Sequence, residues 1–104
     1  MSETQSPVAE IVTFRLIDGA DPATFVANAR ALEPKLRATG QVLSRTLSAA
    51  EDGTWTDHIT WTSMQAAKAA AEQIMADPDA APMMQMIDLD GVEMRHALIH
   101  YQQE

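Results

Sequence analysis

The sequence contains no cysteine among its 104 residues. Without a thiol, the chain has no disulfide, no thiol nucleophile and no cysteine ligand for zinc or an iron–sulfur cluster. This composition fits a reducing compartment, so we expect a cytoplasmic protein.

Positive charge is also scarce: seven Lys and Arg residues stand against fifteen Asp and Glu, for a net charge of −8. Binding to phosphates depends on clustered basic side chains, so we expect neither nucleic acid nor a membrane as a partner. No apolar run approaches the ~20 residues that span a bilayer, which predicts a soluble protein. Residues 1–7 are polar and lack the basic start of a targeting signal, so we expect them to form a disordered N-terminal tail.

The length allows one domain, which we place at residues 8–104. A chain of this size buries only roughly 60–65% of the surface that its unfolded form exposes. Its core is therefore small, and a deep private pocket is hard to build. A partner subunit would relieve that limit.

Runs rich in β-branched and aromatic residues predict four strands. They cover residues 8–17, 42–50, 54–61 and 92–101. The Asp52-Gly53 pair between the second and third runs is a strong hairpin signal. A second Asp-Gly pair, at residues 90–91, predicts a turn before the last strand.

The first of two amphipathic helices is predicted to begin at Asp21, an N-cap followed by proline, and to end at Gly40. Pro34 lies inside this pattern. Because proline lacks a backbone donor and clashes with the preceding turn, we expect a kink or a break near residues 30–33.

A second helix is predicted after Ser63, a good N-cap, and ends before Asp77. Many of its inward positions are alanines, so it can lie close to a sheet. Residues 79–87 predict a short helical turn. The acidic residues around that turn lack the spacing of a calcium loop, and we interpret them as helix caps and solvated turns.

The predicted order, β-α-β-β-α-β, is typical of an α+β protein of the ferredoxin-like class, in which a four-stranded antiparallel sheet carries both helices on one face. The first and last strands carry apolar residues in both phases of their alternation. A large apolar face left open to solvent is unusual in a monomer. We therefore expect a second copy of the chain to cover it.

The run over residues 53–63, with its Trp61-x-Ser63 junction and the alanine-rich helix that follows, resembles the antibiotic biosynthesis monooxygenase-like group of dimeric α+β barrels. The resemblance implies a homodimer whose two sheets close a barrel, with a ligand cavity between the sheet and helices of each subunit. It implies oxygenation of a small aromatic or quinol-like compound with no cofactor. The alternative is a non-catalytic dimeric protein that binds a small hydrophobic ligand or is associated with stress.

Cofactor-free oxygenases of that group have a tryptophan at the end of the third strand and an amide side chain four residues earlier. Trp61 matches the tryptophan, whereas Asp57 replaces the amide with a group that can carry charge and accept a proton. The haem-degrading branch has a histidine ten residues beyond the tryptophan. This chain has Ala71 there, so haem degradation is not expected.

Strand alternation places Trp55, Asp57, Ile59 and Trp61 on one face, which we expect to meet the helices. Partial burial would raise the pKa of Asp57 and make it a general base for a phenolic or enolic ligand stacked on Trp61. The alternative is structural: Asp57 pairs with Arg45 or a backbone donor, and Trp61 fills the core.

Four further residues are candidates for ligand binding: Trp55, His58, Met83 and Met86. Methionine thioethers fill irregular space and suit an adaptable wall around an apolar ligand. Filling gaps in a small core is the alternative for the methionines.

The three histidines do not predict a metal site. His96 and His100 share one face of the last predicted strand, but four residues separate them by about 13 Å, too far for one ion. The first strand is expected to lie between those that carry His58 and His96. We therefore expect no bound metal, and histidines that line the dimer barrel or form local hydrogen bonds.

Overall fold

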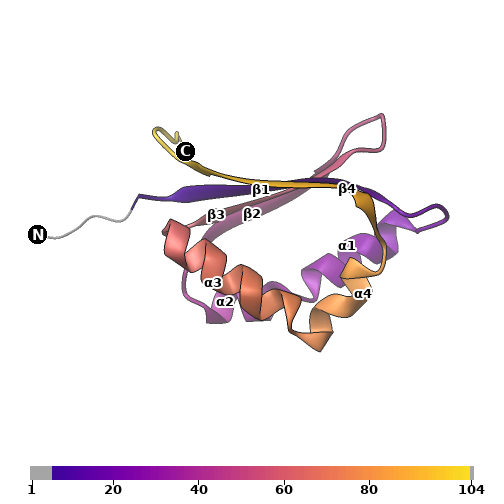
Figure 1. Cartoon of the computed structure of the whole chain (residues 1–104), viewed down its shortest axis with the longest axis horizontal. Helices are drawn as coiled ribbons and strands as arrows, with labels where there is room; N and C mark the ends of the chain where they lie inside the picture. The colour runs from indigo at the N-terminus through magenta and orange to yellow at the C-terminus, as the bar shows by residue number, and fades with distance from the viewer. Residues whose placement is uncertain (1–5, 104) are drawn as a thin grey trace, which may run out of the picture.

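A computed structural model describes residues 6–103 of the chain. Four antiparallel strands form one sheet in the order β2-β3-β1-β4. The strands are β1 (Val8–Leu16), β2 (Val42–Ala49), β3 (Trp55–Trp61) and β4 (Ile87–Leu98). All the helices lie on one face of this sheet, as Figure 1 shows. The ferredoxin-like α+β architecture expected from the sequence is therefore confirmed.

The helical layer consists of three longer segments and a short pair. They are α1 (Pro22–Arg30), α2 (Glu33–Ala38), α3 (Met64–Met75), the 3₁₀ turn η1 (Pro78–Ala80) and α4 (Ala81–Met84). Among the described residues, no helix combines the length and the apolar character needed to cross a bilayer.

The break expected near Pro34 is confirmed, because α1 ends at Arg30 and α2 begins at Glu33. Pro34 lies in the first turn of α2, where its missing donor is harmless. The expected caps are also present: the side chain of Asp21 accepts a hydrogen bond from the Thr24 N–H.

Most of the expected tail at residues 1–7 lies outside the described residues. The carbonyl of Pro7 accepts a hydrogen bond of 3.0 Å from the Ile99 N–H. This bond ties the start of β1 to the segment that follows β4.

The prediction of a turn at residues 90–91 was wrong. Strand β4 begins at Ile87 and runs through both residues to Leu98. Its register against β1 pairs Thr13 with Glu93 but Arg15 with Asp88, so extra residues bulge out between these pairs. Glycine is common in β-bulges as well as in turns. The Asp-Gly pair at residues 90–91 therefore marks a bulge within β4 and not a turn before it.

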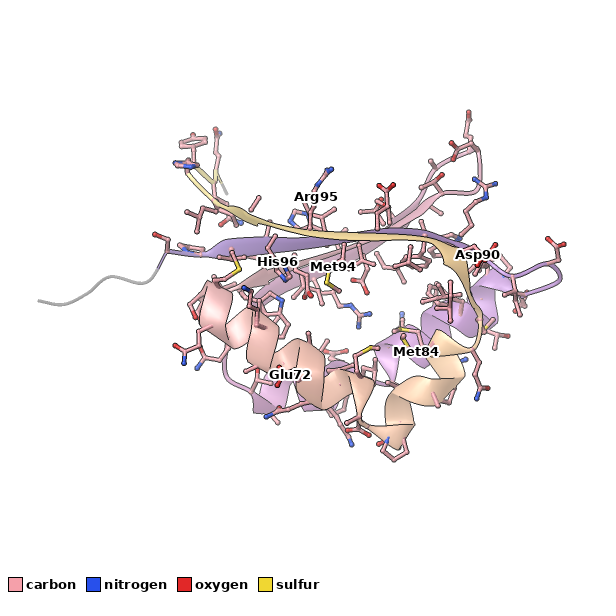
Figure 2. The ribbon with its side chains drawn as sticks, in the orientation of Figure 1. Glu72, Met84, Asp90, Met94, Arg95 and His96 are labelled. Atoms are coloured by element: carbon pink, nitrogen blue, oxygen red, sulfur yellow. The ribbon has the colours of Figure 1, made fainter. Side chains whose placement is uncertain are left out.

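The open face of the sheet differs from the expected apolar surface. The register places Ile11 of β1 between His58 of β3 and Arg95 of β4. Figure 2 shows Arg95 pointing away from the helices, whereas Met94 and His96 point towards them. The centre of the open face is thus mixed, because alternation directs most of the large apolar side chains to the helix side.

The core between sheet and helices contains two clusters of buried side chains. In the first, Phe25 of α1 packs edge-on against Phe14 and Trp55, with ring centroids 5.6 and 5.1 Å away. In the second, Trp61 packs with Leu36 of α2 and with Ala67 and Ala70 of α3. Alanines on the inner face of α3 let this helix approach the tryptophan closely.

A surface ion pair links α2 to the turn after α3. Lys35 contacts the carboxylates of Asp77 and Asp79. The hydrogen bond that the Lys35 ammonium donates to the Asp77 carboxylate raises the pKa of Lys35 and lowers the pKa of Asp77. Asp77 also caps η1 by accepting from the Asp79 N–H, as expected for the acidic residues of this region.

Removal of the α3 cap should destabilise the protein. The Ser63 side chain accepts a hydrogen bond of 3.1 Å from the Ala66 N–H. We expect Ser63→Ala to lower the free energy of unfolding by about 1 kcal/mol, measured by urea denaturation. Ser63→Asp retains the acceptor and should stay close to wild type. Equal losses in both variants would contradict the capping role.

Candidate functional site

A cavity of about 300 Å³ lies between the sheet and the helical layer. Residues of both core clusters line it, together with apolar side chains from β4 and α4. Three of the lining residues carry charge: Glu10 of β1, Arg45 of β2 and Asp57 of β3. A mostly apolar cavity with a few convergent polar groups is the usual form of a small-molecule site.

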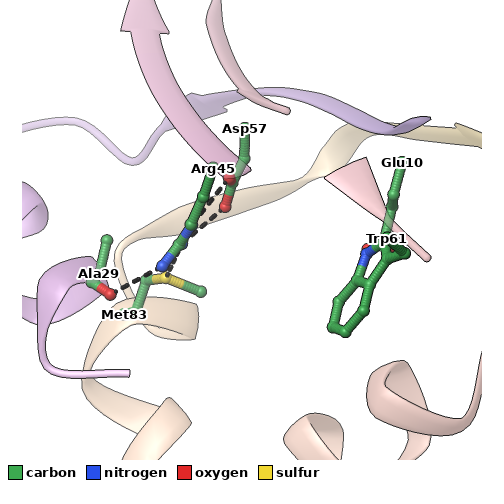
Figure 3. A network of polar contacts seen from close by, with 6 residues as sticks. All are labelled: Glu10, Ala29, Arg45, Asp57, Trp61 and Met83. Carbon is green, nitrogen blue, oxygen red and sulfur yellow. Dashed lines mark hydrogen bonds and ion pairs between the residues drawn. The ribbon is translucent and has the colours of Figure 1, made fainter. Parts of the chain in front are cut away.

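Trp61 forms one wall of this cavity from the end of β3. Only 2% of its surface is exposed. Its indole N–H donates a hydrogen bond of 2.8 Å to Oε1 of Glu10, as Figure 3 shows. Because a buried indole N–H needs an acceptor, this bond fixes the orientation of the ring.

Arg45 and Asp57 form a two-pronged ion pair at another part of the cavity wall. Arg45 Nε donates to Oδ1 of Asp57 at 3.0 Å, and Nη2 donates to Oδ2 at 2.7 Å. Both side chains are mostly buried, with 18% and 13% exposed. The paired arrangement that the sequence left as the alternative for Asp57 is therefore present.

The same guanidinium reaches the helical layer. Arg45 Nη1 donates a hydrogen bond of 2.9 Å to the carbonyl of Ala29, in the last turn of α1, and Nη2 lies 3.9 Å from the sulfur of Met83. One side chain thus connects β2, β3, α1 and α4. Both oxygens of Asp57 are occupied, so accepting a proton from a ligand there would disturb a charged hydrogen bond.

A second carboxylate, Glu10, was not predicted from the sequence as part of the site. It is only 5% exposed and faces His96 directly across the β1–β4 register. Its Oε2 lies 3.5 Å from Nε2 of His96. That nitrogen is buried and has no hydrogen-bond partner among residues 6–103.

A sequence signal for Glu10 existed. Val8, Glu10, Val12 and Phe14 occupy one phase of the alternation in β1, so an acidic residue interrupts an otherwise apolar inward face. Such a residue needs a partner inside the fold. The identity of that partner depended on the register against β4, which local sequence does not specify.

The structure brings together only part of the predicted site. Asp57, Trp61 and Met83 line the cavity, whereas Trp55 and Met86 pack in the first core cluster and are absent from its lining. The side chain of Met86 accepts a hydrogen bond from Asn28.

His58 is exposed, and alternation along β3 places it on the open face, opposite to Asp57 and Trp61. It cannot touch a ligand in the cavity of the same subunit. His58 is absent from the lining of this cavity, so its predicted role in ligand binding stays a prediction for the open face of the sheet. Within residues 6–103 there is no group of three or more His, Asp or Glu side chains placed to hold a metal ion.

The sequence matches no protein-family model and no curated protein. Its fold is shared by solved structures. A mutant of SnoaB, a cofactor-independent oxygenase from Streptomyces nogalater, superposes with a TM-score of 0.72 at 19% identity, over 93% of this chain and 96% of that chain.

Two further structures show the same likeness. One is a candidate antibiotic biosynthesis monooxygenase from Caulobacter crescentus, with a TM-score of 0.71 at 16% identity over 94% of this chain and 93% of that one. The other is a dimeric ferredoxin-like protein of unknown function from Thermobifida fusca, with a TM-score of 0.67 at 14% identity over 95% and 96%. These similarities establish the fold and agree with the resemblance seen in the sequence.

Removal of the guanidinium should leave Asp57 as a mostly buried carboxylate without its partner. We expect Arg45→Met to lower the free energy of unfolding by about 3 kcal/mol in chemical denaturation. The double variant Arg45→Met/Asp57→Leu removes both charges and should recover most of that loss. Arg37→Met, which breaks an exposed pair with Glu33 on α2, is the matched control and should change stability little. Equal effects of the Arg45 and Arg37 substitutions would contradict this account of the pair.

Proposed function

We propose that the protein oxygenates a small aromatic or quinol-like compound with molecular oxygen and without a cofactor. The observation that carries this proposal is the apolar cavity of about 300 Å³, walled by Trp61 and supplied with a few charged groups. Its volume is at the lower end of the range for small-molecule sites. A flat, mostly apolar ligand with an ionisable hydroxyl suits such a lining.

The polar groups are suited to hold an oxygen atom of this ligand. Trp61 offers an aromatic face against which a ring can pack. The Arg45–Asp57 pair supplies a fixed charged group at the cavity wall, which would orient a phenolic or enolic oxygen.

The chemistry needs a proton acceptor and oxygen. Loss of a proton turns the ligand into an enolate, which passes one electron to O₂ and leaves a ligand radical and superoxide. Their recombination forms a carbon–oxygen bond to a hydroperoxide. Loss of water then leaves a carbonyl, so a CH₂ group and O₂ give C=O and H₂O.

The similarity to SnoaB supports this proposal at the level of fold, since that protein is a cofactor-independent oxygenase. The position of Trp61 at the end of β3 supports it at the level of the site. Asp57, where the resemblance expects an amide, would bring a different polarity to the ligand pocket.

The active form is proposed to be a homodimer. The helices cover one face of the sheet and leave the other open (Figure 1), and Ile11 lies at the centre of that face. The similar protein from Thermobifida fusca is dimeric. A second copy packed on the open face would complete the barrel and place His58 inside it.

Sedimentation should therefore give a particle of about twice the chain mass of 11.4 kDa. We expect Ile11→Lys to shift the equilibrium towards the monomer, because it buries a charge in the interface. Ala69→Lys, on an exposed position of α3, adds the same charge away from the open face and should remain dimeric. A compact monomer at micromolar concentration for the wild type would contradict the homodimer.

Filling the cavity should strongly reduce the rate of the oxygenase reaction. Ala71 of α3 lines the cavity, whereas its neighbour Ala69 is exposed. We expect Ala71→Phe to reduce oxygen uptake with anthrone, a tricyclic test substrate, roughly a hundredfold, since the ligand loses its place. Ala69→Phe is the control and should retain wild-type uptake. Wild-type protein that consumes no oxygen with anthrone- or quinol-type compounds would overturn the proposed reaction.

One observation favours the alternative, a non-catalytic binding protein for a small hydrophobic ligand. Both oxygens of Asp57 are held by Arg45, as in a purely structural ion pair. Native mass spectrometry of freshly purified protein distinguishes the two functions when combined with oxygen uptake. A co-purifying small molecule without oxygen consumption would support binding alone.

A further inference from the structure

We infer that Glu10, coupled to His96, is the proton acceptor of the cavity, and that Asp57 is not. This inference rests on the proposed function, because it names the group that would ionise the ligand. It comes from an asymmetry between the two carboxylates that line the cavity, Glu10 and Asp57.

The two carboxylates differ in what holds them. Asp57 receives two charged hydrogen bonds from Arg45, one at each oxygen. Glu10 receives one hydrogen bond, at Oε1, from the indole N–H of Trp61. Its Oε2 lies 3.5 Å from Nε2 of His96, a nitrogen that carries positive charge when it is protonated.

His96 contributes the second observation. Its Nε2 is buried and has no hydrogen-bond partner within residues 6–103. A buried polar nitrogen without a hydrogen bond lowers the stability of the fold. Its presence therefore calls for an explanation, and a functional role is one. An imidazole nitrogen without a hydrogen bond, 3.5 Å from a carboxylate oxygen, is placed to receive a proton that the carboxylate accepts.

Among the charged side chains at the cavity, Glu10 with its neighbour His96 is the pair that can exchange a proton. The other charged residues in the cavity lining are Arg45 and Asp57, which neutralise each other. The lining residues of α3 and α4 are apolar. Within the cavity lining, no further titratable side chain from the helical layer faces Glu10.

The proton transfer balances without an additional reactant. The O–H or activated C–H bond of the ligand breaks, and its proton goes to Oε2 of Glu10 and on to Nε2 of His96. The products are the ligand anion and an imidazolium that is paired with the Glu10 carboxylate. Electron transfer to oxygen follows in the step proposed above.

In this scheme Glu10 touches the ligand, and His96 is a positioning residue that acts through Glu10. The bond to the Trp61 N–H does not itself require a charge, because the amide oxygen of glutamine also accepts. Glu10→Gln therefore separates the two roles: it keeps the support of Trp61 and removes the base.

The test is anaerobic titration with anthrone, followed by the absorption of its enolate, beside titration with anthraquinone, which has no acidic proton. We expect Glu10→Gln to lower the bound enolate fraction roughly tenfold or more, with affinity for anthraquinone within a factor of about two. Glu72→Gln, on the exposed side of α3, is the control and should match wild type. Asp57→Asn should weaken the binding of both compounds and still produce the enolate from bound anthrone.

His96→Asn should move the pH midpoint of enolate formation up by about one unit, while anthraquinone affinity stays unchanged. An unaltered midpoint would assign His96 a structural role and overturn its part in the inference. Enolate formation by Glu10→Gln equal to wild type would overturn the role of Glu10 and leave the oxygenase proposal standing. Wild-type protein that binds neither compound would overturn the proposed function, and the inference with it.

Discussion

The cavity depends on one constraint: a charged group on the inner face of the sheet needs a partner, because the helices cover it. Arg45 meets this constraint for Asp57 and also donates to the carbonyl of Ala29. Because the guanidinium is rigid and planar, it fixes the spacing between β2, β3 and α1. The space between the two core clusters is bounded by this side chain on one side and by Trp61 on another.

The two cavity carboxylates illustrate how environment separates chemical roles. Asp57 is saturated by its arginine and is suited to hold a charge in place. Glu10 supports the Trp61 ring through one oxygen and faces His96 through the other. In the proposed reaction, Asp57 would serve orientation and Glu10 would serve proton transfer, as in enzymes whose paired carboxylates differ in surroundings.

A chain of 104 residues can form such a cavity because the two faces of its sheet have different roles. One face supports the helices, and alanines on α3 bring this helix near Trp61 without filling the space beside it. The other face is mixed in character, with Ile11 between His58 and Arg95. Assembly through that face, as proposed, would supply the burial that the small core lacks and leave the cavity free for a ligand.

The sequence by itself determined the features that depend on neighbours along the chain. These are the strands by their alternation, the helix break before Pro34, the caps at Asp21 and Ser63, and the inward direction of Asp57 and Trp61. Only the tertiary structure decided that Glu10 faces His96 and that β4 continues through a bulge at residues 90–91. The physical reason is that the β1–β4 register joins residues more than seventy positions apart. Local propensity carries no information about that pairing, which arises only when the whole sheet packs against its helices.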